Sequence, residues 1–139
     1  MTWDELVAKI TGTPPAHLAT ATPDGTPHAA TVMPGREGEV LWIAMHATSG
    51  KARNLRANPK VALMFEGNGA ETYLWGDVEL FDDLATKQRI WDAGVLPYDM
   101  AMFFQSADNP DWLLARVTPT RATVMAQGED GIGRHTWTR

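Results

Sequence analysis

The chain has 139 residues and a formal net charge of −5, with 44% hydrophobic and 21% charged residues. These values predict a single compact, soluble domain over residues 1–139 and exclude a disordered or fibrous chain. The sequence has no cysteine, which excludes disulfides, thiolate metal sites and a cysteine nucleophile. An acidic chain without long apolar stretches or an export signal is expected to be cytoplasmic, with no nucleic acid and no membrane as partner.

The first predicted element is a helix over residues 2–11. Its apolar residues recur at the spacing of one helical face. Thr2 and Glu5 stand in the relation of a capping box, in which each side chain satisfies a free backbone amide of the other residue. Gly12 and the prolines that follow it end the helix, and we assign the segment to packing rather than to chemistry.

Short stretches of β-favouring residues then alternate with turn signals. Pro23-Asp24-Gly25 predicts a turn, so residues 16–34 are expected to form a hairpin. Residues 40–45 are almost continuously apolar, as in a strand that is buried on both faces or lies under a ligand. The six expected strands cover residues 16–22, 26–34, 40–45, 60–65, 71–81 and 116–126. Gly76 indicates a bulge or a close backbone approach in the fifth strand, and Pro119 an edge or bulge in the sixth.

Short helical segments separate some of these strands. They are expected over residues 48–56, 82–95 and 112–115, with an irregular stretch before the last one. Leu84 and Trp91 lie on the predicted buried face of the second segment. Residues 127–139, with three glycines, are expected to form a mobile tail unless a contact holds Trp137. The connections before residue 46 are too short for parallel crossovers, so we expect an antiparallel sheet that curls into a barrel with helices at its mouths.

The distribution of charge singles out the middle of the chain. Residues 40–65 contain no Asp or Glu, and they hold four cations, Lys51, Arg53, Arg56 and Lys60. Within this window Thr48-Ser49-Gly50-Lys51 begins a helix, where free amides, hydroxyls and a lysine suit a phosphate group. Two interpretations stay open from the residues alone: an anion site, or an ordinary capped and solvated helix.

Other patterns that carry chemistry are missing from the sequence. The four histidines, His17, His28, His46 and His135, are scattered singly, so no metal site is expected. The chain has no nucleophile elbow of a hydrolase, no P-loop and no dinucleotide-binding glycine motif. The residues alone therefore do not indicate a proteolytic, phosphoryl-transfer or metal enzyme.

Three segments in their order resemble a known family. The hairpin "HLATATPDGTPHAATVMP" precedes the strand–helix–strand run "EVLWIAMHATSGKARNLRANPKVALMF" and the long strand "ETYLWGDVELFDD". Together they resemble the pyridoxamine 5′-phosphate oxidase-like superfamily, and most of all its general stress protein 26-type, flavin-binding branch. The resemblance covers residues 14–126. It implies a mainly β fold, an antiparallel six-stranded split β-barrel with short peripheral helices.

The resemblance also implies a cofactor and a partner. Members of this family form homodimers that bind FMN, or in some branches a deazaflavin coenzyme, at the subunit interface. By position in the sequence, Thr48, Ser49 and Lys51 are then expected to contact the cofactor phosphate. The partner subunit is expected to contribute Trp75 to the same cofactor site.

The flavin ring is expected to lie against two strands. The resemblance implies that Thr31, Val32 and Met33 line the isoalloxazine from the second strand, and that Trp42 and Ile43 lie near it on the third. Because the cofactor itself transfers the hydride, a chain of this kind needs no catalytic cluster of its own.

The function implied by the resemblance is a flavin-dependent oxidoreductase that transfers hydride to or from an unidentified small molecule, with a nicotinamide as a candidate electron donor. Two alternatives stay open: a deazaflavin-dependent reductase, and a non-catalytic flavin-binding or stress-associated module. True pyridoxamine phosphate oxidases carry a C-terminal Trp–Arg signature, whose spacing Arg134-His135-Thr136-Trp137 does not reproduce. Oxidation of pyridoxamine phosphate is therefore not expected.

Overall fold

The computed structural model describes all residues from 1 to 139 and is mainly β, with four helices around one antiparallel sheet of eight strands. The helices are α1 (Trp3–Ile10), α2 (Gly50–Ala57), α3 (Leu84–Asp92) and α4 (Met100–Phe104). The strands are β1 (Ala16–Ala21), β2 (Pro27–Val32), β3 (Gly35–Glu37), β4 (Val40–His46), β5 (Lys60–Gly67), β6 (Ala70–Phe81), β7 (Trp112–Gly128) and β8 (Gly131–Thr138). None of the helices is both long enough and apolar enough to span a membrane.

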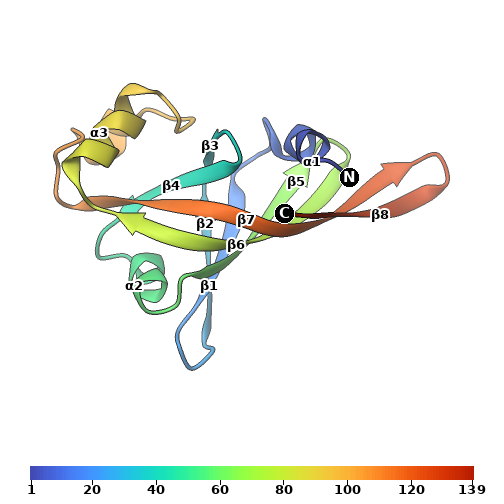
Figure 1. Ribbon diagram of the computed structural model, residues 1–139, viewed down its shortest axis with the longest axis horizontal. Helices are drawn as coiled ribbons and strands as arrows, with labels where there is room; N and C mark the ends of the chain where they lie inside the picture. The colour runs from blue at the N-terminus through green and yellow to red at the C-terminus, as the bar shows by residue number, and fades with distance from the viewer.

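The sheet changes direction along its width, so that β1 and β2 run across β6 and β7 (Figure 1). Its strands follow the order β2-β1-β5-β6-β7-β4-β3, and β8 pairs with β7 outside this path. One edge of β7 pairs with β6, while the other pairs first with β4 and then with β8. The prediction of an antiparallel, mainly β fold is confirmed. The sheet has eight strands rather than six, however, and its path is not closed.

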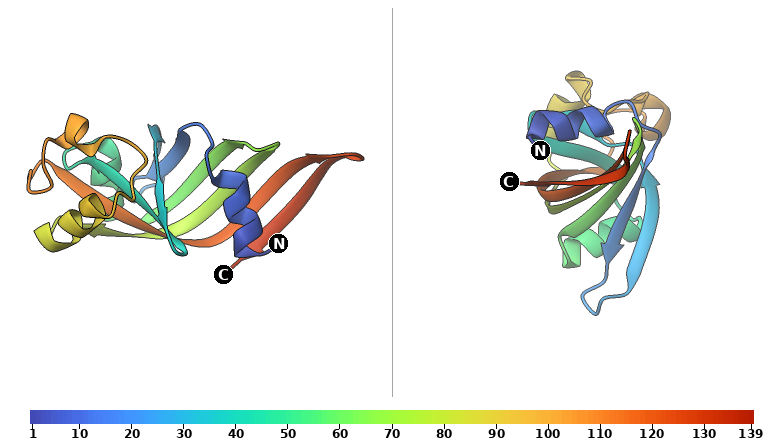
Figure 2. Two further views of the ribbon diagram at one scale, coloured as in Figure 1. Left: turned by 90° about the horizontal axis from the view of Figure 1, so that it is seen from above. Right: turned by 90° about the vertical axis from the view of Figure 1, so that its right-hand side faces the viewer.

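The larger hydrophobic core lies inside the curled sheet. Leu6 and Ile10 of α1 belong to the same buried cluster as Ala52 and Leu55 of α2, and the two helices lie at opposite ends of the curled sheet (Figures 1 and 2). Burial of one leucine side chain contributes about 1.5–3 kcal/mol to stability. The capping box of α1 is confirmed, because the side chain of N-cap Thr2 and that of Glu5 each accept the other's backbone amide.

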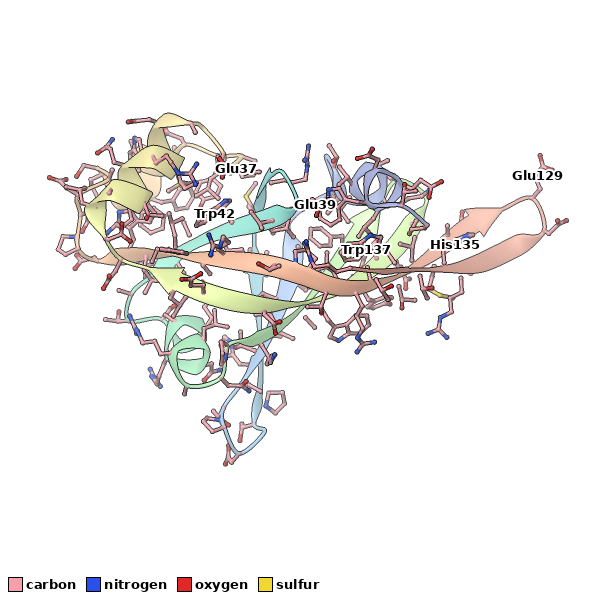
Figure 3. All side chains as sticks on the ribbon, viewed as in Figure 1. Glu37, Glu39, Trp42, Glu129, His135 and Trp137 are labelled. Atoms are coloured by element: carbon pink, nitrogen blue, oxygen red, sulfur yellow. The ribbon has the colours of Figure 1, made fainter.

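A second, smaller core lies on the other face of β4 and β7, against α3 and α4. Trp42 and Trp112 are 1% and 0% exposed in this core, whereas Leu41 and Ile43 of β4 face the larger one. Strand β4 is therefore buried on both faces. The sequence had left two explanations for its apolar residues, burial on both faces or a position under a ligand, and the structure shows the first. Figure 3 shows Trp42 and Glu37 on the side of the sheet that carries α3.

Helix α3 buries only part of the predicted face: Trp91 is half-buried against the second core, as expected, but Leu84 is not. Leu84 is 54% exposed, while Lys87 and Ile90 are buried. The Lys87 ammonium donates to the Asn109 carbonyl at 2.8 Å and lies 4.7 Å from the ring centre of Trp112. Burial lowers the pKa of Lys87, and the nearby aspartates oppose that shift. The burial of Lys87 was missed because a lysine is ordinarily assigned to solvent, although its stem can be buried when the charge has partners.

The C-terminal region differs most from the prediction. Residues 112–115, predicted as a helical turn, begin β7, and residues 127–139, predicted as a tail, form the end of β7 and the whole of β8. Trp137 is 7% exposed, and its ring centre lies 5.2 Å from that of Trp3. The contact needed to hold Trp137 thus comes from α1. Figure 3 shows Glu129 at the tip of the β7–β8 hairpin, far from Trp137.

The irregularity predicted at Gly76 is confirmed. The pairing of β6 with β7 shifts register between Trp75 and Gly76, where Pro119 is the partner. A Cβ atom at position 76 would lie 2.7 Å from Cγ1 of Val117 and 2.8 Å from the carbonyl oxygen of Thr118. Only a glycine allows the two strands to approach this closely.

Candidate functional site

The curl of the sheet brings two distant strands to one groove. Strand β2 stands first in the strand order and β4 sixth, yet residues 31–33 and 44–46 together line a groove of about 380 Å³. The other wall is aromatic and comes from Tyr98, Phe103 and Phe104, while Lys51 of α2 completes the lining. The groove is thus mainly apolar with one cation at its side, as suits a flat ring that carries an anionic group.

Helix α2 begins beside this groove. The Ser49 hydroxyl caps the helix by accepting the Ala52 amide at 3.2 Å. The amides of Gly50 and Lys51 belong to the first turn, so they have no carbonyl of the helix to donate to. The Lys51 side chain is half-buried and pairs with no carboxylate. A Cβ atom at position 50 would lie 3.5 Å from Nε2 of His28, which places this imidazole against the first turn. Free amides, an unpaired ammonium and a nearby imidazole can hold a phosphate.

The structure brings together most of the residues predicted from the sequence. Thr31, Val32, Met33 and Lys51 all line the groove. Thr48 and Ser49 are not among its lining residues, but they lead directly into the first turn of α2. The predicted helix is present, but it covers Gly50–Ala57 rather than residues 48–56, with Ser49 as its N-cap and Asn58 as its C-cap.

Three of the predicted residues lie elsewhere. Trp42 is buried in the second core and Ile43 in the larger one, so neither lines the groove. Ala44, next along β4, takes that place. Trp75 lies on an open face of the sheet, where the Arg121 guanidinium is 3.9 Å from the centre of its ring.

The aromatic wall belongs to the stretch that the sequence presents as irregular. The ring centres of Tyr98 and Phe103 are 5.1 Å apart, and those of His46 and Phe104 are 5.2 Å apart. Burial raises the pKa of Tyr98 to about 12, so its hydroxyl is protonated at neutral pH. That hydroxyl has no hydrogen-bond partner within the chain, and Tyr98 is one of the residues that line the groove. The sequence held one signal that could have indicated this wall: three aromatic residues fall within the short run 98–104.

An uncovered face of the sheet borders the groove. Ala29, Ala19, Ala62 and Trp75 stand in register on β2, β1, β5 and β6, and all four are exposed or half-buried. The right-hand view of Figure 2 shows no helix beyond β1 and β2 on their outer side. Thr31 stands in the next row of the same face and also lines the groove. This open apolar face therefore continues into the groove.

A comparison with protein families decides the identity of this fold and groove. A family model described as pyridoxamine 5′-phosphate oxidase matches residues 2–126. The chain belongs to the pyridoxamine 5′-phosphate oxidase family. This confirms the family resemblance inferred from the hairpin, the strand–helix–strand run and the long strand. A search of the curated proteins finds no match.

Solved structures resemble this pyridoxamine 5′-phosphate oxidase family member over most of its length. General stress protein 26 from Bacillus anthracis has a TM-score of 0.74 and 19% identity, with 98% of this chain and 97% of that chain covered. An FMN-binding protein related to pyridoxamine 5′-phosphate oxidase, from Nostoc punctiforme, has a TM-score of 0.72 and 16% identity, with coverages of 98% and 83%. An F420 reductase has a TM-score of 0.63 and 28% identity, with coverages of 85% and 94%. The first two likenesses establish the fold, which agrees with the expected likeness to general stress protein 26.

Proposed function

We propose that this pyridoxamine 5′-phosphate oxidase family member is a homodimeric oxidoreductase that binds FMN in the groove between β2, β4 and α2. The observation that carries the proposal is the position of Lys51, an unpaired cation at a helix start that also lines an apolar groove. An ammonium without a carboxylate partner favours an anionic ligand, and the apolar walls favour the flat ring attached to it. The FMN-binding name of a structural neighbour supports the same cofactor.

The residues present fit this cofactor. Lys51, the amide of Gly50 and the hydroxyls of Thr48 and Ser49 would hold the phosphate, and residues 31–33 would support the ring. The bound flavin would supply hydride transfer to or from a small molecule, with a nicotinamide as candidate electron donor. The chain's own part is to grip the phosphate, orient the ring between β2 and the aromatic wall, and exclude water. The protonated Tyr98 hydroxyl can donate a hydrogen bond to a molecule in the groove.

A deazaflavin coenzyme is the second candidate, because the F420 reductase shares 28% identity with this chain. Both cofactors combine a flat ring with an anionic group, so the groove itself is compatible with either. Parallel titrations with FMN and with coenzyme F420 decide between them, since the cofactor of the cell should bind more tightly by at least about tenfold.

The proposed dimer uses the open face that carries Trp75. The row of alanines on β2, β1 and β5 is flat and apolar, and exposed apolar faces of this kind mark interaction sites. A second copy packed there would cover Trp75 and reach the groove beside Thr31. Light scattering tests this: Ala62→Glu should convert the dimer to a monomer, whereas the matched change Ala8→Glu, on the exposed side of α1, should not. A monomeric parent protein at micromolar concentration would contradict the proposal.

The phosphate contact is tested by comparing two ligands that differ only in that group. Lys51→Ala should weaken FMN binding by about 10–150-fold, the equivalent of roughly 1.5–3 kcal/mol for a charge-assisted hydrogen bond. Riboflavin, which lacks the phosphate, should bind parent and variant alike. Lys60→Ala removes the same charge from the start of β5, where it pairs with Asp77, and should change neither affinity. Equal FMN affinity for parent and Lys51→Ala would sink the proposed phosphate site.

Turnover is a separate question from binding. Anaerobic mixing of the FMN-loaded protein with NADH or NADPH should bleach the flavin absorbance, and a candidate acceptor should restore it. Tight binding of FMN without reduction by either donor would favour the non-catalytic flavin-binding module over the oxidoreductase.

A further inference from the structure

A second pocket, of about 340 Å³, lies next to the groove. It is enclosed by the link between α1 and β1, by the turn from β2 to β3 and by the link between α3 and α4. Leu41 and Phe65 contribute apolar side chains to its walls, together with several prolines. None of the residues assigned to the cofactor lies in it except Met33, so the pocket is free for another ligand.

The pocket and the groove are direct neighbours, with shared residues between them. Pro15 and Met33 line both of them, and the segment 95–98 supplies Val95 and Pro97 to the pocket and Tyr98 to the groove. This segment lies directly against the backbone of β3, because a Cβ atom at position 35 would lie 2.1 Å from the carbonyl oxygen of Val95. A molecule that reacts in the groove can therefore extend past Met33 into the pocket.

Arg36 determines what such an extension would carry. It is the single ionisable residue of the pocket lining, and it pairs with no carboxylate. One guanidinium N–H donates to the Gly38 carbonyl at 3.0 Å, which leaves other donors free. The two neighbouring carboxylates, both labelled in Figure 3, are engaged elsewhere. Glu37 pairs with Arg89, and Glu39 pairs with Arg139. An unpaired guanidinium at the rim of an apolar pocket matches a carboxylate on an apolar body.

We propose that this pocket binds the far end of the molecule that exchanges hydride with the cofactor, and that this molecule is an amphipathic organic anion whose carboxylate is held by Arg36. The reducible part of the molecule lies in the groove beside Tyr98, and its apolar body passes over Met33. The assignment of the pocket to the reacting molecule rests on the proposed function, whereas the anion site at Arg36 depends only on the lining of the pocket.

The test uses a matched pair of probes, naphthylacetate and its neutral analogue naphthylacetamide. Calorimetry on the FMN-saturated protein should show that Arg36→Gln weakens naphthylacetate binding by about fivefold or more, as expected for a charge-assisted contact at a partly solvated site. Binding of naphthylacetamide should stay unchanged. Arg36→Lys should keep the preference for the anion, and Arg53→Gln, which removes an exposed cation of α2 outside the pocket, should change neither probe.

The outcomes separate this inference from the proposed function. Equal effects of Arg36→Gln on both probes, no effect on either, or displacement of naphthylacetate by FMN would each overturn the anion pocket. A protein that binds no FMN but still shows Arg36-dependent binding of naphthylacetate would remove the redox role and leave the anion site standing. Normal melting of Arg36→Gln would confirm that its effect is local.

Discussion

Gly35 is the position where one methyl group should disturb both the fold and the site. An alanine here would place Cβ 2.1 Å from the carbonyl oxygen of Val95, 2.7 Å from its carbonyl carbon and 3.1 Å from Cα of Leu96. All three are backbone atoms, so no side chain can rotate out of the way. The backbones of β3 and of the α3–α4 link must instead separate by roughly 1.3 Å or more to reach an ordinary contact distance.

The size of the effect follows from three contributions. Replacing glycine by alanine restricts the unfolded chain, which stabilises the fold by about 0.4–1 kcal/mol. Overpacking costs about 1–3 kcal/mol. Displacing Leu96, which is 6% exposed in the second core, loses part of the roughly 1.5–3 kcal/mol gained by its burial. The unfavourable terms are larger, and we expect Gly35→Ala to lower the free energy of unfolding by about 1–3 kcal/mol.

Urea denaturation measures this change, with Gly128→Ala as the matched control. A Cβ atom at position 128 would meet only the Gly131 carbonyl oxygen, at an ordinary 3.6 Å, so the control should lose no more than about 0.5 kcal/mol. FMN affinity should fall in Gly35→Ala as well, because the displaced segment carries Tyr98. A Gly35→Ala protein as stable as the parent would show that the α3–α4 link is not fixed against β3.

Two further predictions concern Tyr98 and Trp137. In a Tyr73→Phe background Tyr98 is the single phenol, and its phenolate absorbance should develop near pH 12 rather than at the ordinary value of 10.0. Because the folded state then keeps a proton that the unfolded state releases, the free energy of unfolding should fall as pH rises from 10 towards 12, and Tyr98→Phe should remove this fall. Trp137→Ala should destabilise the protein by about 3–5 kcal/mol and speed amide exchange in β8. His135→Ala, an exposed change on the same strand, should do neither.

The features predicted correctly from the sequence depend on local contacts. The capping box of Thr2, the turn at Pro23-Asp24-Gly25 and the helix start near Thr48-Ser49 each involve residues within a few positions of one another. Gly76 is a partial exception, because its sequence context predicted a bulge without indicating the strand it would meet. The expectation that Lys51 and residues 31–33 belong to one site came instead from the family resemblance, and the structure places all four residues along one groove.

The features that were missed depend on contacts between distant residues. Trp137 is held by Trp3 at the opposite end of the chain, so the glycine-rich sequence of β8 alone predicted a tail. Lys87 is buried because Asn109 and Trp112 provide partners for its ammonium. In β4 every residue is apolar up to His46, so alternation could not show that Trp42 faces the second core and Ala44 the groove.

The position of β7 in the sheet has a consequence for synthesis on the ribosome. Strand β7 separates β6 from β4 and β8, so three other strands depend on a segment that begins only at residue 112. While the chain is still being translated, β4 and β6 expose unpaired edges with apolar side chains, which are prone to associate with other chains. Productive folding must therefore wait until β7 has emerged, and nascent chains that stall before residue 112 should be chaperone clients.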